Sequence, residues 1–263
     1  MSPLTAALDG LRPMPLAEVD ARAALLSRTC RKYLVPVDLL PTLFAGAGER
    51  SGVLAIDGRR VFRYSSTYLD TPDLGTFHDH RRGRRLRFKA RVRAYVDTGT
   101  RVFEVKLEGP RGVTDKVRMA YDGPADRLTP RTRVFVDDVV GAYGMDPPDR
   151  LAASAVTDYR RCTVVAFSGA ERVTVDTGLV GYRGGRCVRM RPDLALLEVK
   201  TRGGLTPTER RLHEHGNRAV GFSKYGAVLA ALEPGLRGHR WHRAMRTCLG
   251  TPGAIRPGEG PWA

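Results

Sequence analysis

The order of apolar and polar positions divides the chain into a helical start, a long strand-rich middle and a helical end. Residues 15–28 carry apolar side chains at helical spacing and predict an amphipathic helix leading into a strand at residues 29–35. From about residue 53 to residue 200 the pattern repeats every two residues, as expected for short strands separated by turns. Helical spacing returns at residues 206–215, 223–232 and 239–249.

Smaller features fill in this outline. Short helices are expected at residues 36–44, with Asp38 as a cap, and at residues 73–81 and 133–143. Glycines at residues 181–185 predict a hairpin loop, and the Gly- and Pro-rich residues 250–263 predict a loose tail. Because no stretch has the length and composition of an interdomain linker, the sequence predicts a single domain.

The segment at residues 84–95 alternates between apolar and cationic side chains. Successive side chains of a strand point to opposite faces, so one face collects Leu86, Phe88, Ala90, Val92 and Ala94. The other face collects Arg85, Arg87, Lys89, Arg91 and Arg93, with no acidic residue among them. A solvent-facing strand normally mixes charges of both signs, and this pattern therefore indicates a face that meets an anion.

Other strands of the middle region repeat this division into one apolar and one charged face. Their charged or polar faces carry Glu104 and Lys106; Lys116 and Arg118; Tyr159 and Arg161; Arg172, Thr174 and Asp176; and Glu198 and Lys200. If the apolar faces pack under the flanking helices, the charged faces together line a cationic interior. Such an interior needs an anionic occupant, and guanidinium and ammonium groups suit phosphate oxygens.

Composition narrows the classes of protein. The chain has 44 Lys and Arg against 28 Asp and Glu, a net charge of +16, together with 42% hydrophobic residues. This combination excludes a disordered basic tail. No apolar run approaches the ~20 residues of a membrane helix, and the four cysteines lack CxxC spacing. We therefore expect a cytoplasmic protein without a signal peptide, membrane segment, disulfide framework or structural zinc.

Nine short motifs occur in one order along the chain. They are Arg28-x-x-x-Lys32-Tyr33, Tyr68-x-Asp70-Thr71, Lys89-x-Arg91-x-Arg93-x-Tyr95, Glu104-x-Lys106, Lys116-x-Arg118, Tyr159-x-Arg161, Arg172-x-Thr174-x-Asp176-Thr177, Leu197-Glu198-Val199-Lys200 and Phe222-Ser223-Lys224-Tyr225. In this order they resemble the VTC domain, the polyphosphate polymerase domain of the vacuolar transporter chaperone complex, in the triphosphate tunnel (CYTH-like) superfamily. All six lysines of the chain fall inside these motifs.

The resemblance implies an α+β fold, mainly an antiparallel β-barrel with flanking helices. It places a lead-in helix in residues 1–27, the tunnel domain in residues 28–233, and a basic helix with a loose tail in residues 234–263. It also implies an enzyme that transfers the γ-phosphate of ATP to a growing polyphosphate chain with Mn²⁺ or Mg²⁺. ATP and polyphosphate are thus the expected partners, while translocation or regulation would come from other chains, a membrane protein among them.

The motif positions imply roles for individual residues. The implied catalytic group is Lys32, Arg91, Arg93, Glu198 and Lys200, with Glu198 as the metal ligand. The implied substrate-binding group is Lys89, Lys106, Lys116, Arg118, Arg161, Arg172, Ser223 and Lys224. Glu104 and Asp176 are either further metal ligands or salt-bridge partners of arginines. A terminal phosphate acceptor is already anionic and needs no general base, in keeping with a motif set that lacks a catalytic triad.

Two positions depart from the family pattern. Cys30 stands where the family usually has a glutamate, and Val220-Gly221 stands where the eukaryotic enzymes carry a further basic residue. The hydrolytic superfamily members have an ExExK first strand, so Thr29-Cys30-Arg31-Lys32 argues against a two-metal triphosphatase. A catalytically weak polyphosphate- or nucleotide-binding module, or a triphosphatase of the same fold, remain the alternatives.

A nucleic-acid-binding protein is the alternative from another class, since the charge is strongly positive. Single-strand binders stack bases on aromatic side chains, but only 7% of the residues are aromatic, and the Arg85–Arg93 face has none before Tyr95. The sequence therefore favours a phosphate ligand over a nucleic acid. The pairs His78/His80 and His213/His215 are spaced by two residues, which on a helix suits solvent exposure better than metal chelation. The oligomeric state stays open.

Overall fold

The computed structural model describes residues 2–24, 29–109, 114–236, 240–256 and 259–261. The chain folds into two compact units, each assembled from three segments. Unit 1 contains Met1–Phe62, Tyr159–Gly178 and Met190–Gly221, and unit 2 contains Arg63–Asp158, Leu179–Arg189 and Phe222–Ala263. Because the segments of the two units alternate along the chain, no single linker in the sequence marks a boundary between them.

Unit 1 is built from strands covered by short helices. Its elements are α1 (Pro3–Leu8), β1 (Arg12–Met14), α2 (Leu16–Ala24), β2 (Thr29–Pro36), the 3₁₀ turn η1 (Val37–Leu39), α3 (Leu40–Phe44), β3 (Ser51–Leu54), β11 (Leu194–Thr201) and α6 (Pro207–Glu214). It also holds the second half of β8 (Ala152–Ala166) and the first half of β9 (Glu171–Arg183). β11 pairs antiparallel with β2 on one side and β9 on the other, whereas β1 and β3 pair in parallel.

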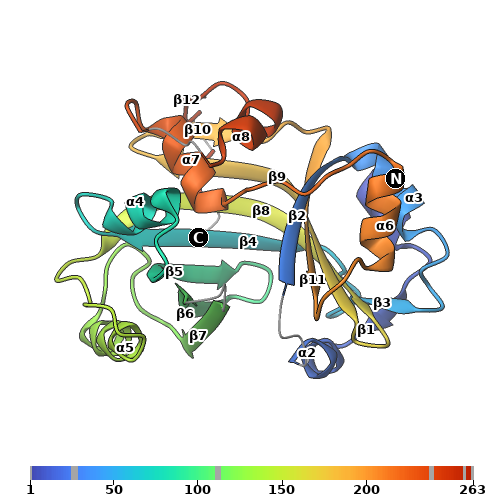
Figure 1. Cartoon of the computed structure of the whole chain (residues 1–263), viewed down its shortest axis with the longest axis horizontal. Coiled ribbons are helices and arrows are strands. Elements are labelled where there is room, and N and C mark those ends of the chain that lie inside the picture. Colours follow the sequence, from blue (N-terminus) through green and yellow to red (C-terminus); the bar gives the residue numbers. More distant parts are fainter. Residues whose placement is uncertain (1, 25–28, 110–113, 237–239, 257–258, 262–263) are drawn as a thin grey trace. The chain divides into compact units, whose positions relative to one another are not determined.

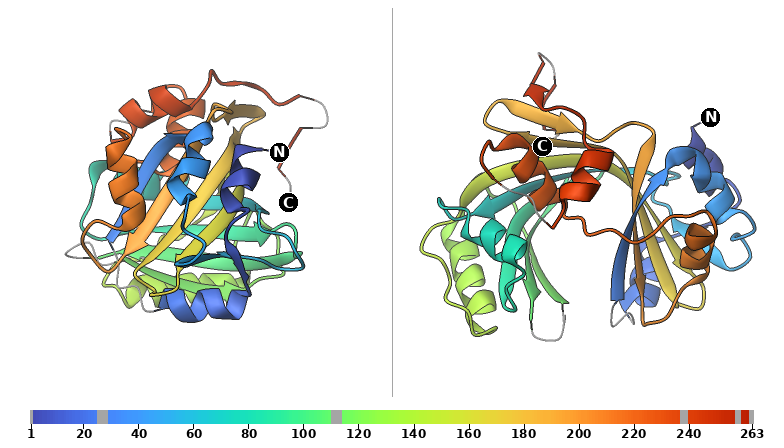
Figure 2. Two further views of the ribbon diagram at one scale, coloured as in Figure 1. Left: turned by 90° about the vertical axis from the view of Figure 1, so that its right-hand side faces the viewer. Right: turned by 45° about the horizontal axis from the view of Figure 1, so that its top comes forward.

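The apolar faces of these strands form the core of unit 1. Val35, Val175 and Leu197 lie in one buried cluster with Leu8 of α1, and that cluster also contains residues of α3 and α6. α3 and α6 lie on the same side of β2 and β11 (Figure 2). The helices thus cover the apolar side, and Lys32, Glu198 and Lys200 are left on the opposite face.

Unit 2 contains the remaining strands. Its elements are β4 (Phe62–Asp70), α4 (Gly75–Arg82), β5 (Arg87–Tyr95), β6 (Thr100–Glu108), β7 (Thr114–Ala120), α5 (Pro130–Gly141), β10 (Arg186–Arg189), α7 (Lys224–Leu232), α8 (His242–Cys248) and β12 (Gly253–Ala254), together with the other halves of β8 and β9. The hydrogen-bonded order is β12-β10-β9-β8-β4-β5-β6-β7, with two ends, and so the sheet is open along this path.

The apolar face of β5 and β6 packs under α5. Val92 and Phe103 are buried in one cluster with Val136 and Val140 of α5, a helix that lies beside β6 and β7 (Figure 1). A second cluster joins Tyr68 of β4 to α4, α7 and α8. α5 thus covers the apolar face of β5 and β6, and the cationic side chains of β5 point to the other face, on which Tyr68 also lies, as the alternation predicts.

Local sequence determines where several helices begin. Thr129 and Thr206 each form a capping box with the third helical residue, and both are followed by Pro in the first turn. Ser223 caps α7 by accepting a hydrogen bond from the backbone N–H of Gly226. The expected cap at Asp38 is wrong, because η1 begins after Pro36 and no side chain caps it.

The α+β class with a mainly antiparallel sheet and flanking helices is confirmed. The short elements α1, β1 and β12 were not expected. β12 lies inside the segment expected to be a loose tail, and it pairs with β10. Arg28 of the first motif lies outside the described residues, as does His239 at the start of the last expected helix. In the described part of the chain, no helix has the length and hydropathy needed to cross a membrane.

Candidate functional site

Three lysines lie side by side on the charged face of unit 2. In the register of the sheet, Lys89 of β5 is opposite Lys106 of β6, and Lys106 is opposite Lys116 of β7. Directly opposed residues of antiparallel strands have Cβ atoms about 4.5–5.5 Å apart, and like charges at that distance destabilise a sheet. We call these three residues the lysine row. A row of ammonium groups on one face provides a binding surface for an extended polyanion.

The next row along the strands contains Arg91, Glu104 and Arg118. The Glu104 side chain is almost fully buried, and its Oε2 lies 2.5 Å from Nη2 of Arg91 and 3.7 Å from Nη1 of Arg93. Its Oε1 lies 3.5 Å from Nζ of Lys116. Burial alone would raise the pKa of Glu104, but the charges of Arg91, Arg93 and Lys116 outweigh it and hold the pKa well below its ordinary value.

A second acid, Glu108, lies at the end of β6. Its carboxylate pairs with Arg87 and lies 3.3 Å from Nζ of Lys106. Nε2 of His80 is 3.5 Å from the same carboxylate. Glu104 and Glu108 thus offset part of the positive charge on this face, but the cations of β5, β6 and β7 outnumber them.

The arginines of β5 are held by polar and aromatic groups of β4. Arg91 donates to Oη of Tyr68 at 3.3 Å, and Arg93 donates to Oγ of Ser66 at 3.3 Å. The Arg93 guanidinium also lies 5.5 Å from the centre of the Tyr64 ring. These contacts orient both side chains before any ligand binds.

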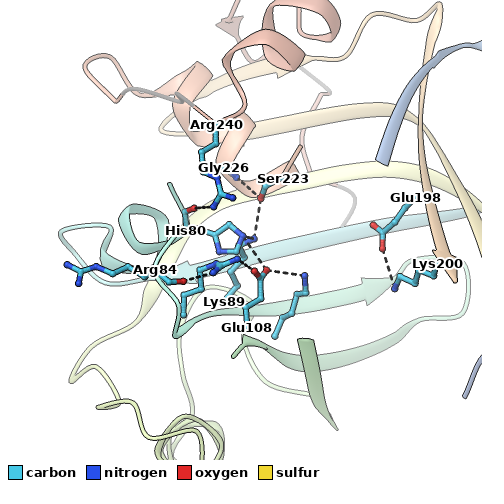
Figure 3. A network of polar contacts seen from close by, with 11 residues as sticks. His80, Arg84, Lys89, Glu108, Glu198, Lys200, Ser223, Gly226 and Arg240 are labelled. Atoms are coloured by element: carbon cyan, nitrogen blue, oxygen red, sulfur yellow. Dashed lines mark hydrogen bonds and ion pairs between the residues drawn. The ribbon is translucent and has the colours of Figure 1, made fainter. Parts of the chain in front are cut away.

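The start of α7 meets β5 at Lys89. Oγ of Ser223 lies 3.3 Å from Nζ of Lys89 (Figure 3). Lys224 is the first residue of the helix. The following residue, Tyr225, is buried and donates to Oδ2 of Asp70 at 2.5 Å. Asp70 also accepts from the backbone N–H groups of Thr76 and Phe77 in α4. Two motif residues, Asp70 and Tyr225, therefore anchor α4 and α7 at this face.

The charged face of unit 1 is centred on Glu198 of β11. Glu198 is opposite Lys32 of β2 on one side and Thr174 of β9 on the other. In the next row, Lys200 is opposite Cys30 and Arg172. The Glu198 carboxylate lies 3.2 Å from Nζ of Lys200 (Figure 3). One acid with three cations on adjoining positions again leaves a net positive face.

Asp176 is engaged by an arginine. Arg161 of β8 donates to both carboxylate oxygens, at 2.5 and 2.7 Å, and Asp176 is almost fully buried. The Arg161 guanidinium also lies 5.2 Å from the centre of the Tyr159 ring. The sequence left open whether Glu104 and Asp176 are metal ligands or salt-bridge partners. In the structure both carboxylates form ion pairs with arginines.

Cys30 sits beside Glu198, at the position where a glutamate was expected from the family. Cys30 is an exposed residue, but desolvation of its thiol, followed by the negative charge of Glu198, raises its pKa to about 11. The side chain is therefore a protonated thiol at neutral pH. A neutral thiol is a poor ligand for Mg²⁺ or Mn²⁺, which prefer oxygen donors.

The residues around Glu198 fit a hard divalent cation. Thr174 is buried, its hydroxyl oxygen has no hydrogen-bond partner among the described residues, and it lies directly opposite Glu198 on the same face. A carboxylate and a hydroxyl supply oxygen donors of the kind that Mg²⁺ and Mn²⁺ take when phosphate oxygens complete the shell. Within the described part of the chain, no three His, Cys, Asp or Glu residues gather into a metal-binding group.

The structure distributes the predicted site residues over the two units. Lys32, Arg161, Arg172, Glu198 and Lys200 share the charged face of unit 1. Unit 2 holds the other eight, Lys89, Arg91, Arg93, Lys106, Lys116, Arg118, Ser223 and Lys224. Sequence reasoning missed Glu108, and its expectation that His80 faces solvent is wrong, because the His80 side chain is 12% exposed and contacts Lys89. The ExKxE spacing from Glu104 to Glu108 could have placed Glu108 on this face, but nothing in the sequence connects His80 to Lys89.

Comparison with known proteins gives the following matches. The family description "VTC domain" matches residues 27–233. A structure of a proposed adenylyl cyclase from Hippeastrum, reported to have a dominant triphosphatase activity, covers 79% of this chain and 98% of its own, with 15% identity and a TM-score of 0.45. A protein from Pyrococcus horikoshii covers 71% of this chain and 90% of its own, with 12% identity and a TM-score of 0.33.

A search among curated proteins found no match. The family match covers most of the chain and contains the motifs from Lys32 to Tyr225, including every lysine. The described residues of that span carry both charged faces. On this ground the chain belongs to the VTC domain family.

Proposed function

We propose that this protein transfers the γ-phosphate of ATP to a growing polyphosphate chain with the help of a divalent cation. The observation that supports this most is the lysine row, Lys89, Lys106 and Lys116, placed on three adjacent strands. Phosphates repeat along a polyphosphate chain, and a row of point charges meets them without requiring a base or a sugar. Membership of the VTC domain family supports the same ligand class.

Phosphoryl transfer asks the protein mainly to position reactants and to neutralise charge. Arg91 and Arg93 present planar guanidinium groups suited to bidentate contact with phosphate oxygens, and they are already oriented by Tyr68 and Ser66. Lys32 and Lys200 flank Glu198 in unit 1 and would contact phosphate there. The acceptor phosphate is anionic at neutral pH, so none of these residues has to remove a proton.

A divalent cation would be held by Glu198, with the Thr174 hydroxyl next to it. When bound, Mn²⁺ or Mg²⁺ would supply positive charge that offsets the negative charge of the phosphate oxygens. Lys200, with its Nζ 3.2 Å from the Glu198 carboxylate, orients that side chain. Glu104 and Asp176 are engaged by arginines, which favours Glu198 as the ligand.

A catalytically weak polyphosphate-binding module is the second candidate. It is favoured by Cys30, which supplies a protonated thiol where a carboxylate would strengthen a metal site. A triphosphatase is less favoured, because Thr29-Cys30-Arg31-Lys32 has no acid that could help to activate water.

The test is to incubate the purified full chain with ATP and Mn²⁺. We expect ADP together with a polymer that exopolyphosphatase degrades. Release of inorganic phosphate alone would identify a triphosphatase. Tight binding of polyphosphate without turnover would identify a binding module, and preference for RNA over polyphosphate at equal salt would favour a nucleic-acid-binding protein.

The metal assignment is tested by Glu198→Gln. We expect loss of polymer synthesis in a variant that still folds, because the amide keeps the shape of the side chain but loses the charge that holds the cation. Asp193→Asn is the matched control, since Asp193 forms an exposed ion pair with Arg191 just before the same strand. Activity of Glu198→Gln equal to that of the control would contradict the assignment.

A further inference from the structure

His80, in the last turn of α4, contacts the first lysine of the lysine row. Its Nε2 lies 2.6 Å from Nζ of Lys89, and Oγ of Ser223 lies 3.3 Å from the same nitrogen (Figure 3). An ammonium group can only donate hydrogen bonds, so Nε2 is the acceptor and the ring carries its proton on Nδ1. With Lys89 as the donor the imidazole is neutral, and its Nε2 then donates no hydrogen bond to the Glu108 carboxylate 3.5 Å away.

The hydroxyl and the imidazole at Lys89 differ in kind from the carboxylates beside the other two lysines of the row. The ammonium groups of Lys106 and Lys116 lie 3.3 and 3.5 Å from the carboxylates of Glu108 and Glu104. A carboxylate orients an ammonium group but also cancels much of its charge. The hydroxyl and the imidazole restrict the direction of the Lys89 side chain and add no negative charge of their own.

The position of His80 is itself fixed by several contacts. Its ring stacks on Trp241, with ring centres 6.3 Å apart and an interplanar angle of 22°. Its backbone carbonyl accepts a hydrogen bond from Nη1 of Arg240 at 3.1 Å. Gly83 ends α4 with a positive φ of 70°, a conformation that glycine adopts readily, and the chain then turns toward β5. The last turn of α4 thus holds the imidazole against Lys89.

We propose that His80 is a positioning residue for phosphate binding, which acts by holding the Lys89 ammonium in its binding direction as a neutral hydrogen-bond acceptor. This inference rests on the proposed function, which makes Lys89 a phosphate ligand. It adds a residue outside the motifs to the site of unit 2. It also explains why a histidine in α4 is directed at β5 and not at solvent.

The experiment measures the Kd of the full-length protein for inorganic tripolyphosphate by titration calorimetry. His80→Phe keeps a ring to stack on Trp241 but has no acceptor, whereas His80→Gln offers an amide oxygen near the place of Nε2 but loses the ring. We expect about tenfold weaker binding for His80→Phe and a change of less than about threefold for His80→Gln. A purely structural role would give the reverse order, because only the phenyl ring preserves the packing.

Two further variants complete the comparison. Lys89→Ala measures the full contribution of the lysine, and His242→Phe, at an exposed position in the first turn of α8, controls for an added phenyl ring. Circular dichroism and Tm establish folding of each variant, and His80→Leu replaces His80→Phe if the latter does not fold. His242→Phe is expected to bind like the wild type.

The outcomes separate this inference from the proposed function. If Lys89→Ala binds more weakly while His80→Phe binds like the wild type, or if His80→Gln is as weak as His80→Phe, the positioning role is overturned. If Lys89→Ala binds like the wild type, Lys89 is not a phosphate ligand and the inference falls with that assignment. If binding follows the expected order but ATP yields no polymer, the proposed activity falls and the positioning role stands.

Discussion

Replacing Glu104 by Gln removes the negative charge at the centre of a cationic cluster in unit 2. The carboxylate is 1% exposed and lies within 4 Å of Arg91, Arg93 and Lys116. Removing one partner of a buried ion pair typically costs about 3–5 kcal/mol. The Arg91 and Lys116 side chains are 19% and 41% exposed, and solvent therefore screens part of the released charge. We expect the lower end, about 3 kcal/mol.

The assay is thermal unfolding with and without tripolyphosphate. A loss of about 3 kcal/mol lowers Tm by about 6–12 °C in a chain of this size. A ligand at 100 times its Kd stabilises the folded state by about 2.7 kcal/mol. In Glu104→Gln, bound phosphate also replaces the missing negative charge, so the Kd of the variant for tripolyphosphate should be lower than that of the wild type. At a fixed ligand concentration, the rise in Tm of the variant should therefore exceed that of the wild type.

Asp193→Asn is the control for this prediction. Its pair with Arg191 is exposed and screened by solvent, so this variant should unfold at nearly the Tm of the wild type and show the same ligand-induced rise in Tm. A Tm of Glu104→Gln that lies within about 2 °C of the Tm of Asp193→Asn would show that the carboxylate does not stabilise the cluster. A ligand-induced rise in the Tm of Glu104→Gln no greater than that of the wild type would show that phosphate does not replace the missing charge.

The low pKa of Glu104 links the same interaction to pH. A carboxyl group whose pKa is lower in the folded than in the unfolded state contributes its full stabilisation above the unfolded value. That stabilisation is lost as the pH falls below the ordinary glutamate pKa and through the folded one. The wild type should therefore lose its stability advantage over Glu104→Gln in acid, and a constant difference between pH 7 and pH 3 would contradict this account.

Three further predictions follow from other parts of the structure. Tyr225→Phe removes a buried donor to the Asp70 carboxylate and should cost about 1.5–3 kcal/mol in urea unfolding; an unchanged midpoint would contradict this role. Gly181→Ala places a methyl carbon 2.3 Å from Cγ1 of Val228 and should cost about 1–3 kcal/mol, with partial recovery when Val228→Ala is added. Alkylation of Cys30 by iodoacetamide should keep accelerating with pH up to about 11, and a plateau near pH 9 would show an ordinary thiol.

Local sequence was sufficient to predict which side chains share a face and where many helices lie. In β5 the alternation put Phe88, Ala90 and Val92 in the core and the cations on the other face, because side-chain direction in a strand is a property of the backbone itself. The start of α6 was predictable for a similar reason, since Thr206 and Glu209 cap the helix through groups three residues apart. Elements of two or three residues, such as β1 and β12, carry too few positions to show a period.

The sequence also identified the residue types of the site and the class of ligand that they suit. A run of cations on one strand face and six lysines confined to nine motifs indicated phosphate before any contact was known. The resemblance of these motifs to the VTC domain agrees with the family match over residues 27–233. The roles of the individual site residues stay predictions that the proposed experiments test.

Only the tertiary structure decided how these residues are grouped. Register depends on which strands pair, and it is this pairing that aligns Lys89, Lys106 and Lys116 and sets Glu198 beside Lys32 and Thr174. Pairing also determines the state of the acids, because a carboxylate becomes an ion-pair partner or a metal ligand according to which cations reach it. The sequence thus set the chemistry of each face through local backbone geometry, whereas long-range packing, which no local pattern encodes, determined the neighbours of each charge.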